Sequence, residues 1–531
     1  MFIPLTPIRC LHRAMDLYGS KVGVVSGTRE FTYQQFGERA ERLASGLTQM
    51  GIARGDIVAY LSFNNHQLLE GYYGVVQARA VVMPLNIRLS PAELSAILCH
   101  SGANMVIFEN EFAPIAEGLK KTCPTVAHWV SIDEPAGPAR ISYEEILSQG
   151  QAVRADIASF DELAIAELFY TSGSTGTPKG VALSHRTLYL HALDVGLLYD
   201  RPQTMVELHT IPLFHANGWG RPQASTMLGV KQVMVRRFDP LNVLDLLQRH
   251  GATDMCVVPT MAQAVIQTVA NAPGKWDTSS LRRVMIGGAP SSAELVERME
   301  AALPGCECVA GYGLTETSPV VTTSLWKGVP YGSEVERVRR QAMAGWPVVG
   351  TEVRVVDAEM HDVPRDSKTM GEVVIRGDQV MDGYYREPDA TRAVMSGDWF
   401  HTGDMAVWDE ESYVNIVDRK KEIIISGGEN ISSIEIEKAI ASHPAVLECA
   451  VVAAPDDKWG EVPAAIVTCK PGVVLTEEEI RLHLEQRVTR YKMPRIIEFC
   501  GDPLPKTGTG KIRKMILREK YWTGKDKRVQ G

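Results

Sequence analysis

The chain has 531 residues, of which 45% are hydrophobic, and its formal net charge is -9. Roughly two to four domains fit this length, and the hydrophobic content is ordinary for a globular protein. The negative balance argues against a general nucleic-acid-binding protein. Residues 506–531 differ, because they carry nine Lys or Arg against two Asp or Glu. Such a basic end suits a polyanionic ligand, or it is a solvated tail.

The nine cysteines are scattered, and an odd number is a poor disulfide framework. Cys306 and Cys308 are too close together for zinc-site spacing, so we expect reduced thiols. No apolar run reaches the ~18 residues that a membrane-spanning helix needs. We see no signal peptide at the start, and the final RVQG is not an SKL-type peroxisomal signal. We expect a cytoplasmic protein with no membrane span and no nucleic-acid partner, and leave a homodimer open.

The N-terminal part alternates short β-branched runs with amphipathic helical patterns. This pattern predicts strands and helices in the order 56–63, 66–78, 80–86, 91–102 and 104–109, with strands first and last. It returns with a strand, a helix and two strands at 231–238, 240–251, 253–259 and 281–290. Apolar strands separated by helices predict parallel sheets that are covered on both faces.

From about residue 348 the pattern changes to short strands separated by turn residues. These strands are expected at 351–358, 371–377 and 413–419, and predict a β-rich subdomain over about 348–418. A compact α+β module follows, with expected elements at 421–428, 432–444, 446–456, 463–470, 476–488 and 496–500. We therefore predict an α/β fold with an N-terminal domain over 1–418 and a small C-terminal domain over 419–531.

The stretch YTSGSTGTPKGV, at 170–181, follows a strand-like run and combines glycines, hydroxyl residues and one lysine. Glycines allow the backbone to approach a ligand closely, and successive N–H groups in such a loop form an anion-binding nest. The loop is not a Walker A motif, since Pro178 and Gly180 flank Lys179 where glycine and Ser or Thr belong. GYGLTE at 311–316 lacks the third glycine of a dinucleotide fingerprint. Taken alone, a loop of glycine, serine and threonine is more often a plain surface turn than a phosphate site.

Five further motifs follow in order: GGAP at 287–290, GYGLTET at 311–317, HTGD at 401–404, DRKKEIIISGGENISSIEIE at 418–437 and PKTGTGK at 505–511. Together with the glycine-rich stretch they resemble the signature of adenylate-forming enzymes, the group of acyl-CoA synthetases, firefly-luciferase-like enzymes and peptide-synthetase adenylation domains. The resemblance implies a large N-terminal domain of two αβ layers plus a β-subdomain, a hinge, and a small mobile C-terminal domain. Our boundary near Asp418 falls where this family has its hinge.

The reaction implied by the resemblance has two steps. A small-molecule carboxylic acid attacks the α-phosphorus of ATP with Mg²⁺, and coenzyme A then attacks the acyl-adenylate. Because two anions meet in the first step, positioning and charge neutralisation carry the catalysis. The implied catalytic residues are Lys511, Glu316, Thr315 and His215, with Glu316 as the metal ligand. Without the motif, Lys511 is one more lysine in a basic tail.

The resemblance also assigns binding residues. The implied nucleotide-binding residues are Thr171, Ser172, Gly173, Ser174, Thr175, Gly176, Lys179, Gly288, Ala289, Pro290, Gly311, Tyr312, Gly313, Thr315, Asp404 and Arg419. The implied hinge and coenzyme A channel comprise Asp418, Gly427, Gly428 and Glu429. On residue type alone, Tyr312 fits a core position, Asp404 a turn, and the two glycines a hairpin.

The segment IPLFHANGWG, at 211–220, is implied to form the acyl site. The expected pocket residues are His215, Trp219, Gly220, Val258, Thr260 and Gly287, with Met261 beside them. Ala216 and Asn217 follow His215, where amino-acid-activating relatives usually have an aspartate, which argues against amino acids. LFHANGW and SGGENISS are most similar to the short- and medium-chain acyl-CoA synthetase branch, so we expect a short- to medium-chain, branched or alicyclic acid.

Four alternatives stay open at this point. The acyl group could pass to a carrier protein instead of coenzyme A, although 531 residues show no attached carrier domain. The substrate could be an aromatic acid. A luciferase-like oxygenase would need O₂, and a nucleotide-sensing protein without catalysis would not need Lys511, Glu316 and Asp404.

Overall fold

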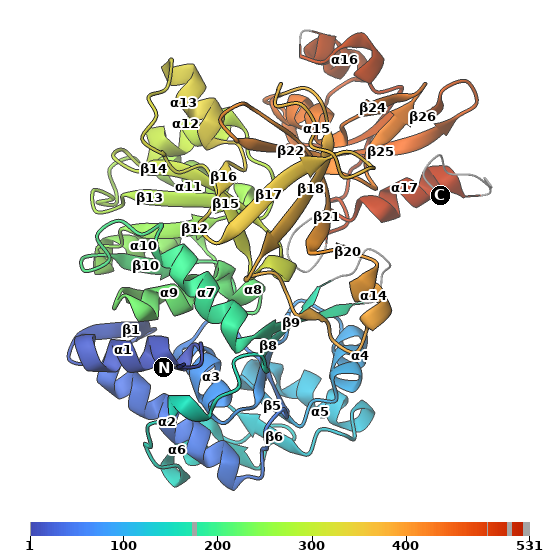
Figure 1. The fold of residues 1–531 in the computed structure, drawn as a ribbon. Helices are drawn as coiled ribbons and strands as arrows, with labels where there is room; N and C mark the ends of the chain where they lie inside the picture. The colour runs from blue at the N-terminus through green and yellow to red at the C-terminus, as the bar shows by residue number, and fades with distance from the viewer. Residues whose placement is uncertain (1, 172–177, 486, 507–511, 524–531) are drawn as a thin grey trace. The chain divides into compact units, whose positions relative to one another are not determined.

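A computed structural model describes residues 2–171, 178–485, 487–506 and 512–523 (Figure 1). The chain divides into two compact units, of which the first contains Met1–Val353 with Ile375–Phe400 and the second contains Arg354–Val374 with His401–Gly531. The mixed α/β architecture, with a large N-terminal and a smaller C-terminal domain, confirms the predicted fold class. The boundary near Asp418 and the β-rich subdomain over 348–418 stay predictions.

The helices of the first unit are α1 Ile8–Tyr18, α2 Tyr33–Gln49, α3 His66–Gln77, α4 Pro91–Ser101, α5 Ala113–Thr122, α6 Tyr143–Gln149, α7 His185–Gly196, α8 Ala216–Trp219, α9 Arg221–Met227, α10 Pro240–His250, α11 Pro259–Asn271, α12 Ala293–Ala302, α13 Glu334–Gln341 and α14 Pro388–Arg392. Several begin at the capping residues that the sequence offers. Ser90 caps α4, and Glu93 bonds back to it in a capping box.

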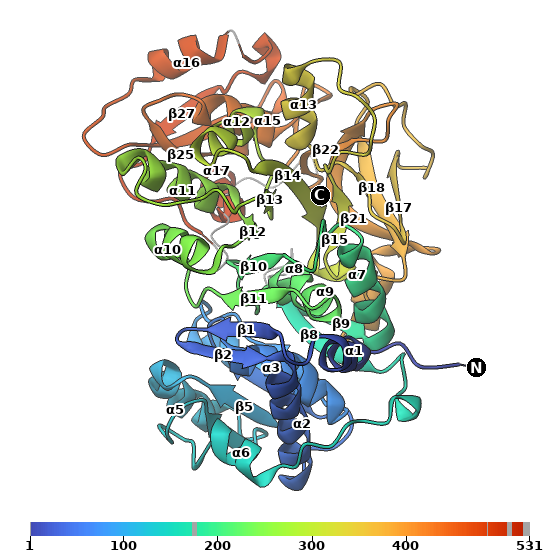
Figure 2. The ribbon, with the colours of Figure 1, turned by 90° about the vertical axis from the view of Figure 1, so that its left-hand side faces the viewer.

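A nine-stranded sheet of the first unit has the order β16-β15-β14-β13-β12-β10-β11-β1-β2. Figure 2 shows the strands from β14 to β2 following one another in this order. The strands from β14 to β1 are parallel neighbours, and the outer strands are antiparallel. Their bounds are β1 Val22–Ser26, β2 Arg29–Thr32, β10 Val206–His209, β11 Lys231–Met234, β12 Asp254–Val257, β13 Arg283–Gly287, β14 Glu307–Gly313, β15 Val320–Thr323 and β16 Trp346–Pro347.

An eight-stranded sheet of the same unit has the order β19-β9-β8-β4-β3-β5-β6-β7. Its bounds are β3 Ile57–Leu61, β4 Val81–Pro84, β5 Met105–Phe108, β6 His128–Ser131, β7 Ile141–Ser142, β8 Ile165–Thr171, β9 Lys179–Ser184 and β19 Gly383–Tyr384. Alternate residues of β3 enter different cores, since Val58 and Tyr60 pack with residues of α2 and α3. Ala59 and Leu61 pack with residues of α4 and α5. Both faces of this largely parallel sheet are covered, as predicted.

A five-stranded sheet has the order β17-β18-β21-β20, with β22 paired to β21. Its bounds are β17 Thr351–Val356, β18 Gly371–Gly377, β20 Met395–Ser396, β21 Trp399–Trp408 and β22 Val414–Arg419. The three strands expected in this region from the change of sequence pattern are therefore present.

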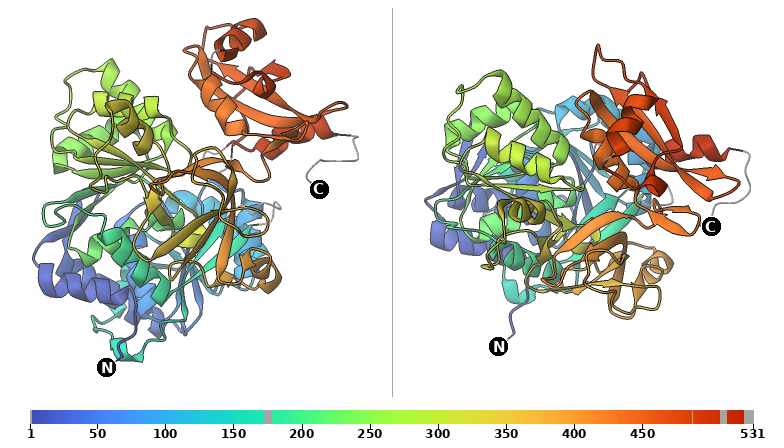
Figure 3. Two further views of the ribbon diagram at one scale, coloured as in Figure 1. Left: turned by 45° about the horizontal axis from the view of Figure 1, so that its top comes forward. Right: turned by 90° about the horizontal axis from the view of Figure 1, so that it is seen from above.

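The C-terminal sheet, which is drawn in orange and red in Figure 3, has the order β24-β23-β26-β25, with β27 paired to β26. The bounds are β23 Ile424–Ser426, β24 Glu429–Ile431, α15 Ser433–Ala441, β25 Val446–Asp456, β26 Gly460–Cys469, α16 Glu477–Glu485, β27 Ile496–Phe499 and α17 Lys514–Trp522. Val451 and Ala453 pack with α15 and α16, whereas the alternate residues Ala450 and Val452 pack with α17. The sheet therefore has helices on both faces.

Candidate active site

The glycine-rich loop joins β8 to β9. Five of its predicted nucleotide-binding residues, Ser172, Gly173, Ser174, Thr175 and Gly176, lie outside the described residues, as does Lys511. The flanking strands pair antiparallel, and Thr171 is the partner of Lys179 in the register. The hairpin therefore brings these two predicted residues face to face where the loop begins and ends.

Tyr384 connects two predicted site residues that are far apart in the sequence. Its hydroxyl donates a 3.0 Å hydrogen bond to Oε1 of Glu316, and Nζ of Lys179 lies 4.8 Å from the centre of its ring. An ammonium over an aromatic face is attracted to it. Tyr384 could not be predicted from the sequence, because only the pairing of β19 with β9, which sets Tyr384 opposite Val181, brings it here.

The predicted adenine-binding residues lie at the carboxyl ends of two neighbouring parallel strands. Gly287, at the end of β13, is in register with Gly311 of β14. Ala289 and Pro290 follow Gly288 and are exposed, and Tyr312 and Gly313 complete β14. Ligands of α/β sheets typically bind at such strand ends.

Thr315 and Glu316 follow β14 directly, in the short 3₁₀ helix Thr315–Thr317. Thr315 is buried, whereas Glu316 is half-buried. The backbone carbonyl of Glu316 also accepts a 2.8 Å hydrogen bond from the N–H of Met381. The segment that carries the predicted metal ligand is thus tied through both its main chain and its side chain to residues 381–384.

The predicted acyl-site segment has an unusual backbone. Five consecutive residues have positive φ, namely Ala216 (44°), Asn217 (36°), Gly218 (60°), Trp219 (62°) and Gly220 (73°). The left-handed region costs L-residues about 1–2 kcal/mol each, so surrounding contacts must hold this turn. We call Ala216–Gly220 the left-handed turn. His215 precedes it and is half-buried.

The indole of Trp219 packs against the turn at the end of β13. A Cβ atom at Gly287 or at Gly288 would lie 3.1 Å from atoms of the indole, so glycine permits this close approach. A Cβ at Gly288 would also lie 3.2 Å from Val258. The structure therefore brings together four predicted acyl-pocket positions, Trp219, Gly287, Val258 and the adjoining Gly220. Thr260 is the second residue of α11, close to Val258 in the chain, but it is exposed.

In the second unit, the predicted ribose-binding residues form an ion pair. Nε of Arg419 lies 2.6 Å from Oδ1 of Asp404, and the two residues face each other across β22 and β21. The carboxylate is buried while the guanidinium is half exposed, with side-chain exposures of 5% and 45%. This pair could present a carboxylate and a cation to the hydroxyl groups of a sugar.

Asp418, the predicted hinge residue, holds the start of α15. Its carboxylate accepts hydrogen bonds from the N–H of Ser433 (2.5 Å), the hydroxyl of Ser433 (2.7 Å) and the N–H of Ile434 (3.4 Å). Burial raises the pKa of Asp418, while nearby Lys514 opposes that shift. Nζ of Lys514 lies 2.7 Å from the same Ser433 hydroxyl, so the helix that follows Lys511 in the chain is anchored beside the predicted hinge residue.

Gly427 and Gly428 form the two-residue turn of the β23–β24 hairpin, with φ values of 60° and 88°. Two positive φ angles are what a type I′ hairpin turn needs, which explains the glycine pair structurally. Glu429 follows the turn and is exposed. A contact of Gly427, Gly428 and Glu429 with coenzyme A stays a prediction.

Two family models match the chain: the AMP-binding enzyme model covers residues 11–385, and the AMP-binding enzyme C-terminal domain model covers residues 435–511. The chain belongs to the AMP-binding enzyme family. Membership implies an adenine-nucleotide site, and the two matches together include the glycine-rich loop and Lys511.

Known members of the AMP-binding enzyme family resemble this chain along nearly its whole length. The long-chain-fatty-acid–CoA ligase of Thermus thermophilus is 39% identical over 521 residues, covering 96% of this chain and 94% of the relative. The 2-methylpropanoate–CoA ligase CCL4 of Humulus lupulus is 35% identical over 534 residues, covering 97% of this chain and 95% of the relative. The solved structure of ATP-bound MatB from Rhodopseudomonas palustris has a TM-score of 0.84 at 27% identity, with coverage of 97% and 99%. The chain is thus similar along nearly its whole length to acyl-CoA ligases of the AMP-binding enzyme family.

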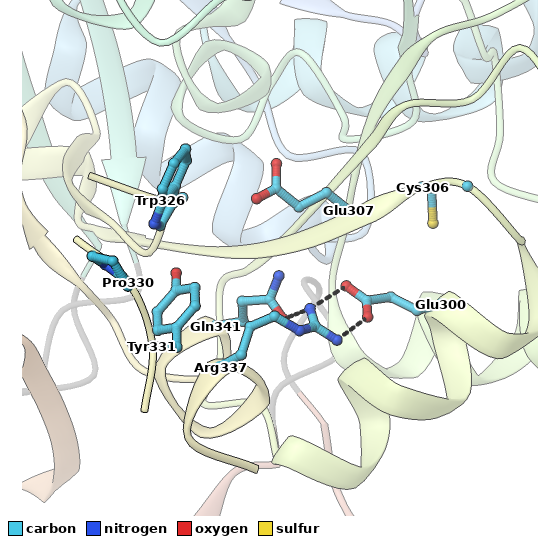
Figure 4. Close-up of a pocket in the computed structure, with 9 residues that line it drawn as sticks. Glu300, Cys306, Glu307, Trp326, Pro330, Tyr331, Arg337 and Gln341 are labelled. Atoms are coloured by element: carbon cyan, nitrogen blue, oxygen red, sulfur yellow. Dashed lines mark hydrogen bonds and ion pairs between the residues drawn. The ribbon is translucent and has the colours of Figure 1, made fainter. Parts of the chain in front are cut away.

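A surface pocket of about 630 Å³ lies elsewhere in the first unit (Figure 4). Trp326, Tyr331, Glu307 and Arg337 line it, and Arg337 is paired with Glu300 at 2.9 Å. None of its lining residues belongs to the site predicted for this AMP-binding family member. Glu307 begins β14, whereas Tyr312 and Gly313 end it, so the pocket lies at the opposite end of this strand.

The acidic, cysteine and histidine side chains show how a metal ion could be held. Within the described ranges, no three His, Cys, Asp or Glu side chains cluster as a metal site. A Mg²⁺ ion that reaches a protein with its nucleotide needs only one or two carboxylates besides phosphate oxygens and water, so the single carboxylate of Glu316 fits this role.

Among the described residues, the structure contains no helix whose length and apolar character would allow it to span a membrane.

Proposed function

We propose that the protein is an AMP-forming carboxylic acid–CoA ligase. The acid's carboxylate attacks the α-phosphorus of ATP, which forms acyl-adenylate and releases pyrophosphate. The thiolate of coenzyme A then attacks the acyl carbon, which forms acyl-CoA and releases AMP. One observation carries the proposal: in a member of the AMP-binding enzyme family, Tyr384 links Lys179 and Glu316 beside the strands that flank the glycine-rich loop.

In the first step, we propose that the following residues bind the nucleotide and neutralise its charge. Lys179 and the loop residues 172–176 bind the β- and γ-phosphates, and Lys511 stabilises charge that develops at the α-phosphoryl group. Thr315 contacts the α-phosphate, and Tyr312 stacks on adenine beside Gly288 and Pro290. Glu316 would hold Mg²⁺, which neutralises phosphate charge when bound. His215 orients the carboxylate.

For the second step, we propose that the C-terminal domain turns about Asp418. Gly427, Gly428 and Glu429 then line the channel for the pantetheine arm, where a narrow ligand must pass close to the backbone. Asp404 and Arg419 bind the ribose. A homodimer and a cytoplasmic location remain predictions.

We further propose a short- to medium-chain, branched or alicyclic acid as the substrate. The buried indole of Trp219, packed against Gly287 and Gly288, supports a short pocket because it fills space that a longer chain would need. The named ligases among the relatives act on long-chain fatty acids and on 2-methylpropanoate, so they leave the chain length open. An aromatic acid is the second candidate, favoured by the solved anthranilate CoA ligase AuaEII, with a TM-score of 0.86 at 26% identity over 98% of both chains.

The test is a panel of straight, branched, alicyclic and aromatic acids, scored by AMP formation with and without coenzyme A. A ligase forms AMP and a thioester only when acid, ATP and coenzyme A are all present. Transfer to a carrier protein would instead give acid-dependent ATP–pyrophosphate exchange without turnover on coenzyme A. If no acid in the panel supported ATP–pyrophosphate exchange, both the ligase and the transfer to a carrier protein would be contradicted.

A further inference from the structure

Glu167 is a buried carboxyl group in β8, four residues before Thr171. It has no exposed surface, and its Oε2 accepts a 3.0 Å hydrogen bond from Nδ2 of Asn217. Its Oε1 accepts a 2.7 Å hydrogen bond from Nε2 of Gln223. Across the described ranges, no Lys, Arg or His forms an ion pair with this carboxyl. The two amides are therefore its polar partners.

These two amides lie at either end of a strained piece of chain. Asn217 belongs to the left-handed turn, and Gln223 lies in α9, immediately beyond it. One carboxyl group thus spans the segment between them and ties it to β8. A buried side chain with two hydrogen bonds can hold a backbone that its own residues do not favour.

Trp219 lies inside the segment that Glu167 spans. The direction of its indole depends on the backbone angles of the left-handed turn, and the indole packs on Gly287 and Gly288. A shift of the turn would therefore move the indole relative to the end of β13. The hydrogen bonds of Glu167 to Asn217 and Gln223 therefore bear on the position of the indole.

We propose that Glu167 is a positioning residue for the acyl site, which holds the left-handed turn through Asn217 and Gln223 and so sets the pocket wall formed by Trp219. The inference rests on the proposed function, because that function makes the wall a determinant of acid selectivity. Glu167 itself does not touch the reacting atoms.

The state of the amide groups supports a neutral carboxyl in this position. Oδ1 of Asn217 and Oε1 of Gln223 are buried without a hydrogen-bond donor. A protonated carboxyl has one O–H that can satisfy one of these oxygens once that amide is turned over. Burial raises the pKa of Glu167 to about 8, in keeping with this arrangement. Glutamine has nearly the same shape and is also neutral, so it should replace Glu167 with little effect.

The test compares Glu167→Leu, which removes both hydrogen bonds, with Glu167→Gln, which keeps an acceptor and a donor. Glu41→Leu is the matched control, because Glu41 is a buried carboxyl of α2 in the same unit and contacts neither Asn217 nor Gln223. For each variant we would measure KM for the best acid and KM for ATP. We would also measure the selectivity ratio, which is kcat/KM for a short acid divided by kcat/KM for an acid that is longer by two methylene groups.

We expect Glu167→Leu to raise the acid KM at least about 10-fold and to change the selectivity ratio by a similar factor. The KM of Glu167→Leu for ATP should stay within about 2-fold of the parent value. The acid KM and the selectivity ratio of Glu167→Gln and of Glu41→Leu should stay close to those of the parent. An equal rise in KM for the acid and for ATP, or an unchanged selectivity ratio in folded Glu167→Leu, would overturn the proposal. If Glu167→Leu does not fold, Gln223→Leu removes one of the two contacts and should shift selectivity in the same direction.

A second readout does not depend on turnover. The protein is labelled with 5-fluorotryptophan, and the ¹⁹F resonance of Trp219 is assigned with Trp219→Phe. The resonance should move in Glu167→Leu and stay in place in Glu167→Gln; no movement in either would contradict the positioning role. If no acid is activated by the parent protein but the resonance responds as expected, the proposed function fails while the structural role of Glu167 stands.

Discussion

The hydroxyl of Tyr384 donates a hydrogen bond of 3.0 Å to Oε1 of Glu316. The same ring lies 4.8 Å from Nζ of Lys179. A single side chain therefore orients a carboxylate proposed to hold Mg²⁺ and contacts a cation proposed to bind phosphate. The contact is made by residues from three distant segments of the chain.

Tyr384→Phe should weaken the nucleotide site without disrupting the fold. The change removes the hydrogen bond to Glu316 but keeps the ring beneath Lys179. We expect kcat/KM for ATP to fall by about 10-fold or more, because one hydrogen bond to a charged group is worth ~1.5 kcal/mol or more. ATP–pyrophosphate exchange at varied Mg²⁺ measures it. Tyr384→Leu, which also removes the ring, should lose more. Identical activity in all three proteins would exclude this role.

Lys511→Ala should impair adenylation selectively. Loss of one positioned charge-stabilising group typically costs about 100–1000-fold in rate. Formation of the thioester from preformed acyl-adenylate and coenzyme A should be nearly unaffected, since that step needs no charge at the α-phosphate. Single-turnover assays of both half-reactions give the comparison, and an equal loss in both would remove Lys511 from the proposed role.

Trp219→Ala should favour longer acids. The indole is 6% exposed and packs on Gly287 and Gly288, so its removal opens space at the end of β13. We expect the ratio of kcat/KM for a longer acid over a short one to rise about 10-fold or more. A panel of straight-chain acids measures this ratio. A uniform loss for all chain lengths would show that Trp219 does not limit the pocket.

Glu167→Gln should change how stability depends on pH. Burial raises the pKa of Glu167 from 4.5 to about 8, so between these values the folded protein keeps a proton that the unfolded chain has lost. The contribution of Glu167 to stability therefore falls as pH rises through this window, by at most about 1.4 kcal/mol per pH unit. Tyr72 and Tyr73 lie close to Glu167, and their raised pKa values keep them neutral.

The measurement is the free energy of unfolding at several pH values between 5 and 8 for both proteins. The variant should gain stability relative to the parent as pH rises. Asp194 and Glu437, whose pKa values burial raises to about 7, titrate in both proteins and cancel in the difference. A difference that does not change with pH would show that Glu167 is already ionised in the folded state.

Lys514→Met should destabilise the C-terminal domain. Lys514 lies 2.8 Å from Glu437, whose side chain is 18% exposed. Removing the cation leaves this largely buried carboxyl without its ion-pair partner, which costs up to about 3–5 kcal/mol. Lys520→Met is the control, since Lys520 pairs with Glu498 at an exposed position and should change stability by less than ~1 kcal/mol. Denaturant unfolding measures both, and equal effects would refute the buried-pair argument.

The layered fold could be predicted because its local signals agree. In the run from β3 to β5, each apolar strand and each helix of 66–101 appears within a few residues of the expected bounds. Buried parallel strands and amphipathic helices have distinct periodicities, and caps such as Ser90 mark where a helix begins. The sequence alone was therefore sufficient for this alternation of strands and helices, whereas the two αβ layers were implied by the resemblance to adenylate-forming enzymes.

The contacts that distinguish this site could not be predicted in the same way. Tyr384 reaches Glu316 only because β19 pairs with β9, some two hundred residues away, and no local pattern encodes that pairing. Ala216 and Trp219 would ordinarily avoid positive φ, so the left-handed turn exists through tertiary contacts. Glu167 lies in an apolar run and offers no motif, although a lone acidic residue in such a strand is a signal worth following.

The most direct measurement is the fate of ATP when purified protein meets carboxylic acids with and without coenzyme A. The account predicts acid-dependent pyrophosphate release with an acyl-adenylate that can be isolated, and its conversion to acyl-CoA and AMP only when coenzyme A is added. Folded, ATP-binding protein that forms no acyl-adenylate from any acid in the panel would contradict the account.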